Sequence, residues 1–255
     1  MAQHVTLSAL PGIPEIRPGD DLADIIATAL DAMRLTLKPH YILIVAQKIV
    51  SKAEDRFVDL SEITPSSRAR DLAARAEKDP RLVEVILRES DEVVRYKPGV
   101  IVVAHRLGFV MANAGIDRSN LGPDDGREVV LLLPEDPDAS AAELRRRLEA
   151  RYDVPLGVVV SDSFGRAWRN GVVNVALGTA GLPALVDARG SPDRDGRTLN
   201  VTQVAFADAL AAAAGLVMGE GNEGCPVVHV RGAARATPDV TAAALIRPRE
   251  EDLFR

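Results

Sequence analysis

Three acidic segments carry side chains that could bind a divalent metal ion through oxygen atoms. Asp117 and Asp162 each follow a predicted strand, and Glu220 lies in a glycine-rich segment, residues 219–224. Small residues flank Asp162 and Glu220 directly, and Gly115 and Ser119 each lie two positions from Asp117. Carboxylate oxygens favour Mg²⁺ or Mn²⁺ over softer metals. The alternative for any one of these acids is ordinary turn chemistry, because Asp and Asn often cap helices and turns.

Basic side chains stand close to these acids in the sequence. Arg118 adjoins the first acid, Arg166 and Arg169 follow the second, and Lys48 and Lys52 come after another predicted strand. Cations beside metal-binding carboxylates suit a phosphorylated ligand, since metal and cation share the phosphate charge. The alternative is a set of solvated surface charges.

The glycine-rich segment matches the letters G-x-G-x-x-G, but a dinucleotide site needs a strand before that motif and a helix after it. Here a predicted helix precedes the motif, and Cys225-Pro226 leads into a predicted strand, so we exclude a Rossmann site. The sequence also lacks a G-x-x-x-x-G-K-[ST] phosphate loop, an H-E-x-x-H zinc motif and a G-x-S-x-G nucleophile turn. The glycines still allow the backbone to approach a ligand closely.

The composition is that of an acidic globular protein. The 255 residues carry 31 Lys and Arg against 37 Asp and Glu, a net charge of −6. Nucleic acids and anionic membranes attract basic proteins, so neither is an expected partner. No apolar run is long enough to span a membrane, and residues 1–11 lack the pattern of a signal peptide. Cys225 is the single cysteine, so no intrachain disulfide can form, and we expect a cytoplasmic protein.

Helix-type and strand-type patterns alternate at irregular spacing along the chain, which predicts a mixed α+β fold with interleaved helices rather than a doubly wound one. Residues 134–137 and 189–196 are predicted loops or subdomain boundaries. We expect Trp168 to fill the core, His105 to be structural and Cys225 to have no catalytic role. The patterns predict helices over 20–37, 66–78, 81–89, 139–151, 202–214 and 240–245, and strands over 41–50, 100–104, 109–112, 129–133, 156–161, 172–177 and 227–230.

Six short motifs, in this order, resemble those of the coenzyme F420-0:L-glutamate ligase family, the γ-glutamyl ligases of deazaflavin biosynthesis. The resemblance covers essentially the whole chain, and six ordered motifs are far more specific than any single one. They are Leu10-Pro11-Gly12-Ile13-Pro14, Ile49-Val50-Ser51-Lys52-Ala53-Glu54, residues 112–117 with Ser119-Asn120, Ser161-Asp162-Ser163-Phe164-Gly165-Arg166, residues 218–225, and Ile246-Arg247-Pro248 followed by Glu250-Glu251-Asp252.

The resemblance implies a GTP-dependent ligase that forms an amide. GTP would phosphorylate the terminal carboxylate of coenzyme F420-0, a lactyl-phospho-deazaflavin. The α-amine of L-glutamate would then attack the acyl phosphate, releasing GDP and phosphate, and further glutamates would follow through γ-linkages. The implied cofactors are two divalent ions, Mg²⁺ or Mn²⁺, and a monovalent cation such as K⁺.

The resemblance also assigns roles to individual residues. Asp117, Asp162 and Lys52 match catalytic positions. Asp117 and Asp162 match ligands of one metal ion, and Ser163 and Glu220 match ligands of a second. At Gln47, five places before Lys52, relatives commonly carry a small hydroxyl residue. The positions that match nucleotide contacts are Leu10, Pro11, Gly12, Ile13, Gln47, Lys52, Asn120, Met218, Gly219, Glu220, Gly221, Asn222, Glu223, Gly224 and Cys225.

The resemblance further implies an α+β fold that assembles as an intertwined homodimer. We expect one ligase unit over residues 1–255, with at most two subdomains and without the C-terminal flavin-binding reductase-like domain of fused family members. Two other enzyme classes stay open: an amino-acid ligase with a different carboxylate acceptor, and a metal-dependent nucleotide phosphohydrolase. A non-catalytic nucleotide-binding module is the third alternative.

Overall fold

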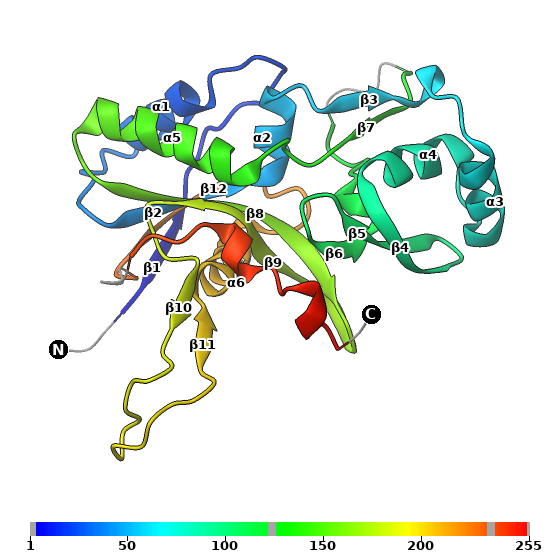
Figure 1. Ribbon diagram of the computed structural model, residues 1–255. Coiled ribbons are helices and arrows are strands. Elements are labelled where there is room, and N and C mark those ends of the chain that lie inside the picture. Colours follow the sequence, from blue (N-terminus) through cyan, green and yellow to red (C-terminus); the bar gives the residue numbers. More distant parts are fainter. Residues whose placement is uncertain (1–3, 122–125, 234–237, 254–255) are drawn as a thin grey trace.

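A five-stranded sheet forms the centre of the protein (Figure 1). The computed structural model describes residues 4–121, 126–233 and 238–253. β2 and β8 lie parallel, whereas the other neighbours are antiparallel. In spatial order the strands are β1 (Thr6–Ala9), β12 (Val227–Arg231), β2 (Tyr41–Ala46), β8 (Leu156–Arg166) and β9 (Arg169–Ala180).

Helices cover both faces of this sheet, with α1 and α5 on one face and α6 on the other (Figure 1). Successive side chains of a strand point to opposite faces. Leu43 and Val45 of β2 therefore pack with α1 and α5, whereas Ile42 and Ile44 pack with α6. Burial on both faces explains why β2 is a continuous apolar run. The helices are α1 (Leu22–Ala32), α5 (Pro137–Tyr152) and α6 (Phe206–Met218).

A glycine allows α5 to begin directly against the sheet. A Cβ at Gly178 of β9 would lie 2.0 Å from the carbonyl oxygen of Pro137, so a larger residue would push the helix away. The Asp136 side chain caps α5 by accepting a hydrogen bond from the Ala139 N–H (3.0 Å). The Asp138 carboxylate also accepts the Thr179 N–H (2.8 Å), which fixes the helix on β9.

A second group of elements forms a smaller lobe with its own core, which includes Leu72, Ile86 and Ile101. Asp79 caps α4, and Pro80 occupies its first turn, where a missing N–H costs little. The lobe contains the sheet β4 (Ser90–Lys97), β5 (Val100–His105) and β6 (Val110–Ala112), the pair β3 (Phe57–Asp59) and β7 (Val129–Leu131), the helices α3 (Ser67–Ala76) and α4 (Pro80–Arg88), and the 3₁₀ turns η1 (Leu60–Glu62) and η2 (Asn113–Gly115).

Two hairpins leave the main sheet (Figure 1). The end of the β8–β9 hairpin extends beyond the sheet beside the smaller lobe, and Phe164 of β8 contacts Phe109 edge to face at 5.9 Å. The second hairpin, β10 (Leu185–Asp187) with β11 (Gln203–Ala205), projects from the body. Its connection contains residues 189–196, one of the predicted loops.

The structure confirms the α+β class and most predicted elements. The predicted strands over 100–104 and 109–112 are the paired β5 and β6, and the two helices separated at Pro80 are α3 and α4. Residues 134–137 join β7 to α5, as expected for a boundary. No helix in the described ranges is long and apolar enough to cross a membrane.

Several predicted boundaries were wrong. The strand predicted over 41–50 ends at Ala46, and α2 (Gln47–Ala53) follows without a loop. The apolar run continues because Ile49 and Val50 are buried in the same core as β2. Residues 202–214 divide into β11 and the start of α6, and residues 240–245 contain only the 3₁₀ turn η3 (Ala242–Leu245). A further 3₁₀ turn, η4 (Arg249–Glu251), follows, and β4 was not predicted.

Two further expectations were wrong in a way that concerns the site. The strand predicted over 156–161 continues as β8 to Arg166, so Asp162 lies within a strand and not in a loop. Trp168 does not fill the core: it lies between β8 and β9 and is 81% exposed.

Candidate active site

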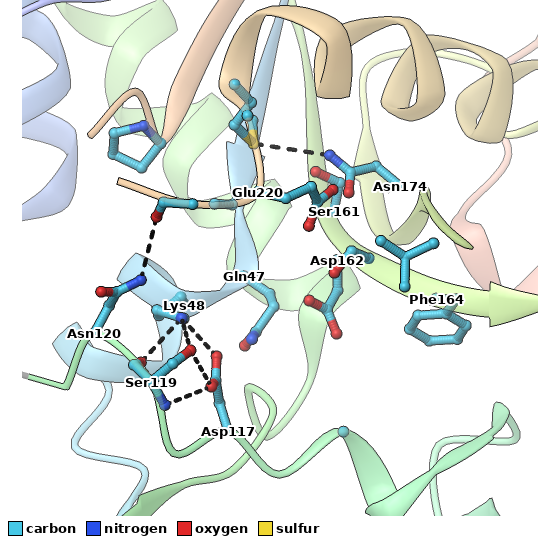
Figure 2. Close-up of a pocket in the computed structure, with 18 of the residues that line it drawn as sticks. Gln47, Lys48, Asp117, Ser119, Asn120, Ser161, Asp162, Phe164, Asn174 and Glu220 are labelled. Carbon is cyan, nitrogen blue, oxygen red and sulfur yellow. Dashed lines mark hydrogen bonds and ion pairs between the residues drawn. The ribbon is translucent and has the colours of Figure 1, made fainter. Parts of the chain in front are cut away.

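A cavity of about 1290 Å³ lies between the main sheet and the smaller lobe. Its walls come from the start of α2, the segment after η2, the strand β8 and the loop between α6 and β12 (Figure 2). All three acidic segments of the sequence therefore meet at one cavity. Asp117, Asp162 and Glu220 line it, and so do Ser163 and Lys52.

The parallel pairing of β2 and β8 places two of these walls side by side. Ala46, the last residue of β2, is in register with Ser161 of β8. Gln47 and Asp162 follow these two residues at the same edge of the sheet, and Figure 2 shows both side chains within the pocket. The edge where parallel strands end is a common place for ligand sites in α/β proteins.

Asp117 is held by a cation from α2. Its backbone N–H and C=O both pair with Leu131, which anchors the segment on β7. The carboxylate accepts hydrogen bonds from the Ser119 N–H (2.9 Å) and hydroxyl (2.8 Å), and its Oδ2 lies 2.6 Å from Lys48 Nζ (Figure 2). Burial alone would raise the pKa of Asp117, but Lys48 and the Ser119 donors together lower it below its ordinary value.

Asp162 has the opposite electrostatic environment. Burial raises its pKa to about 7, and the nearby charges of Asp117 and Glu220 act in the same direction. The Ser163 N–H and the charge of Lys48 oppose this effect only in part. The ionised form of Asp162 thus lacks a compensating positive charge, and a bound cation would supply one.

The donors of this cluster fit a hard divalent ion. Asp117, Asp162, Glu220 and Ser163 offer only oxygen atoms, and such sets suit Mg²⁺ or Mn²⁺. The neighbouring Ser161 hydroxyl is buried without a hydrogen-bond partner, an unmet polar group at the cavity wall. Within the described ranges, no three Asp, Glu, His or Cys side chains already lie close enough to hold an ion. Lys48 already pairs with Asp117, so an ion bound by Asp117 would have to compete with Lys48 for that carboxylate.

Lys52 does not simply follow a strand, as the sequence suggested, but lies on α2 with only 4% of its surface exposed. Its Nζ forms an ion pair with Glu15, and both residues line the cavity. Gln47, also buried, accepts a hydrogen bond from the Ser51 hydroxyl at its Oε1 (2.8 Å). The Gln47 side chain is therefore held from within α2.

The glycine-rich loop joins α6 to β12, so it lacks the strand-then-helix setting of a dinucleotide site. Gly219 has a φ of +75°, and a Cβ there would lie 2.2 Å from the Glu223 carboxyl carbon. The Glu223 carboxylate accepts the Gly221 N–H (2.8 Å), which folds the loop on itself. Asn120 Nδ2 donates to the Gly221 carbonyl at 3.5 Å and ties the loop to the Asp117 segment (Figure 2).

The predicted nucleotide residues fall into two groups. Gln47, Lys52, Asn120, Ile13 and residues 218–225, Cys225 included, line the cavity. Leu10, Pro11 and Gly12 do not: Leu10 is fully buried and its N–H donates to the Val227 carbonyl (2.9 Å), whereas Pro11 and Gly12 are exposed.

Sequence reasoning missed two charged residues of the cavity, Glu15 and Lys97. Glu15 gave no signal because its partner Lys52 lies 37 residues away, and Lys48 had been noted only as one of several nearby cations. His105 is structural, as expected. It is fully buried, its Nδ1 accepts the Leu107 N–H (3.0 Å), and its Nε2 faces Glu89 at 3.6 Å.

Comparisons with known proteins find similar sequences. The family model described as F420-0:Gamma-glutamyl ligase matches residues 12–232. The coenzyme F420:L-glutamate ligase of Methanopyrus kandleri is 47% identical over 245 residues, 94% of each chain. The proteins of the same name from Methanothermobacter thermautotrophicus and Halorubrum lacusprofundi are each 46% identical, over 98% and 88% of this chain and 99% and 86% of theirs.

These matches define a class of enzyme, the ligases, and extend over nearly the whole chain. The protein belongs to the F420-0:γ-glutamyl ligase family.

Proposed function

We propose that this protein joins L-glutamate to the terminal carboxylate of coenzyme F420-0 in a GTP-dependent reaction that passes through an acyl phosphate. The observation that carries the proposal is the meeting of Asp117, Asp162 and Glu220 with Lys48 and Lys52 at one cavity. The names of the relatives support glutamate and F420 as substrates. Carboxylates and cations at one cavity support phosphoryl transfer, in which catalysis is mainly positioning and charge neutralisation.

Two divalent ions, Mg²⁺ or Mn²⁺, belong to the proposal and would neutralise the charge of the transferring phosphoryl group. Asp117 and Asp162 would hold one ion, and Ser163 and Glu220 the other. The unpartnered Ser161 hydroxyl and the raised pKa of Asp162, which burial and the neighbouring carboxylates cause, support this assignment. A monovalent cation such as K⁺ is proposed by family resemblance alone.

The chain's own residues would position the nucleotide. The loop 219–224 offers backbone N–H groups where glycines allow close approach, and Asn120 holds that loop against the Asp117 segment. Lys52 would exchange its Glu15 partner for the nucleotide phosphates, and Lys48 would exchange Asp117 for them. Both lysines carry the positive charge that stabilises a transferring phosphoryl group.

The decisive experiment is mass spectrometry of F420-0 after incubation with the protein, GTP, Mn²⁺ and L-glutamate. We expect a gain of one glutamyl residue, followed by further additions, and no gain when GTP is omitted. No gain, while a relative assayed in parallel adds glutamate, would overturn the proposal. Phosphate release without any amino acid would instead identify a nucleotide phosphohydrolase. Glutamate transfer to another carboxylate acceptor would identify a ligase of different specificity.

We also propose, from its single cysteine, that the protein works in the cytoplasm. From the family resemblance we propose that it is an intertwined homodimer, and light scattering tests this oligomeric state directly. The chain mass is 27.3 kDa, so a dimer doubles the scattering mass, and a stable monomer at assay concentration would refute it.

A further inference from the structure

One end of the cavity carries positive charge that the proposed phosphoryl-transfer site does not use. Lys97 comes from β4 of the smaller lobe, and Arg166 and Arg169 come from the end of the β8–β9 hairpin. These three residues, here called the cationic end, line the same cavity as Asp162. The hairpin lies beside β6 in Figure 1, so the cationic end is formed by two different parts of the fold.

Among the described residues, no carboxylate pairs with the cations of this end. The side chains of Lys97 and Arg169 make no hydrogen bond or ion pair in that part of the chain, and the Arg166 side chain donates only to the Asn170 carbonyl at 3.5 Å. Elsewhere arginines such as Arg81 and Arg151 each bridge two carboxylates. Unpaired guanidinium groups that line a cavity are suited to a phosphate or another anion.

Apolar side chains lie next to these cations. Phe164 of β8 lines the cavity, as do Val110 of β6 and Val172 of β9. Val110 is 41% exposed and Val172 is 51% exposed, although both lie in strands. Ligand pockets commonly combine such an apolar wall with a few charged groups that fix orientation. The wall and the cations together suit a ligand that is both anionic and partly apolar.

The dimensions allow this ligand to bind together with a nucleotide. The volume of about 1290 Å³ exceeds the roughly 300–1,000 Å³ of an ordinary ligand pocket. Arg166 lies four positions after Asp162 on β8, a span of about 13 Å at the rise of an extended strand. A molecule with its carboxylate near Asp162 therefore reaches toward the cationic end.

We infer that the cationic end and its apolar wall form the acceptor subsite, which rests on the proposed ligase function. The ligand class is an acceptor that carries a phosphodiester and a flat aromatic ring. Lys97, Arg166 and Arg169 bind the phosphodiester, and Val110, Val172 and Phe164 contact the ring. The terminal carboxylate then points toward Asp162, on the side of the proposed metal ligands.

Acceptor binding and GTP binding, each measured by equilibrium dialysis, test this subsite. Arg169→Gln and Lys97→Gln should each raise the Kd for F420-0 about tenfold, because each removes a charge-assisted hydrogen bond, and should leave the Kd for GTP unchanged. Arg68→Gln is the matched control, since Arg68 is exposed on α3 and does not line the cavity. For the apolar wall, Val172→Glu should weaken F420-0 binding, whereas Val201→Glu, at a residue 85% exposed outside the cavity, should not.

The outcomes separate this inference from the proposed function. A wild-type protein that adds glutamate while the Arg169 and Lys97 variants bind F420-0 normally would overturn the subsite and leave the ligase function intact. Variants that lose GTP affinity instead would assign the cations to the nucleotide. A Val172→Glu variant that changes the scattering mass without changing F420-0 binding would make the wall a subunit contact. Failure of the wild-type protein to bind F420-0 would overturn the subsite outright.

Discussion

The ion pair between Lys48 and Asp117 gives a prediction that does not depend on turnover. A divalent ion at the proposed site would compete with Lys48 for the same carboxylate, because Lys48 Nζ lies 2.6 Å from Asp117 Oδ2. Lys48→Met removes the positive charge and keeps most of the side-chain volume. We expect this variant to be less stable than wild type without metal, and to be stabilised more strongly by Mn²⁺.

The size of both effects follows from the burial of the pair. The two side chains are 24% and 23% exposed, between a surface pair worth about 0.2–1 kcal/mol and a buried pair whose disruption costs about 3–5 kcal/mol. The free energy of unfolding should therefore fall by about 1–3 kcal/mol. Each kcal/mol lost lowers the Tm by about 2–4 °C in a chain of this size. Metal at a hundred times its Kd adds about 2.7 kcal/mol to a protein that binds it only when folded. The Lys48→Met variant keeps all of this added free energy of unfolding. In wild type the metal must displace Lys48 from Asp117, so the free energy of the lost ion pair is subtracted from the gain.

Thermal unfolding with and without Mn²⁺ is the assay. Lys38→Met provides a control, since Lys38 is exposed and its side chain has no ion pair among the described residues. Asp117→Asn combined with Lys48→Met should reduce the Mn²⁺ response below that of Lys48→Met alone, because the shared carboxylate is gone.

Two results would refute this reasoning. A Lys48→Met variant as stable as the Lys38→Met control would show that the ion pair contributes nothing. An equal Mn²⁺ response in wild type and variant would show that the metal and Lys48 do not compete for Asp117.

Three further predictions concern other residues. Lys52→Met should raise the Kd for GTP about tenfold, and Glu15→Gln should lower it by releasing Lys52, both measured by calorimetry; no change in either would make the buried pair purely structural. Asp162→Asn should reduce turnover about 10²-fold or more, and adding Asp117→Asn should cost little more because the two act as a unit; near-normal turnover with a lowered Tm would make Asp162 a structural residue. Burial alone would raise the pKa of Glu89, but its partners His105, Arg106 and Arg56 outweigh burial. In the folded protein the pKa of Glu89 therefore lies below its ordinary value of 4.5. Its stabilisation is therefore fully present above pH 4.5 and lost as the pH falls further, so Glu89→Gln should lower the Tm at pH 7 and make the acid transition shallower; parallel Tm–pH curves would contradict this.

The type and neighbours of a residue could be judged from the sequence. The acids at positions 117, 162 and 220 were selected because carboxylates beside small residues suit a metal ion, and the structure brings all three to one cavity. The α+β class also followed from local patterns, since periodicity reports which face of each element is buried.

The boundaries of helices and strands could not be predicted from the sequence where both elements are equally buried. The run from Tyr41 to Val50 reads as one apolar segment, yet the backbone changes from strand to helix at Gln47. Ile49 and Val50 remain in the core after the change, so apolar content alone carries no mark of it. β8 likewise extends through the polar residues after Ser161 because β9 pairs with it beyond the sheet.

The chemical groups of the site, their local order and the class of the fold depend on near neighbours along the chain, so they could be predicted from the residues alone. The partners of these groups depend on how the chain folds. Lys48 meets Ser119, 71 residues away, because α2 follows β2 directly at the edge of the sheet. Lys52 is buried against Glu15, and Trp168 is exposed beyond the sheet. Such contacts depend on strand register and on how the chain crosses between elements, and local patterns do not specify either.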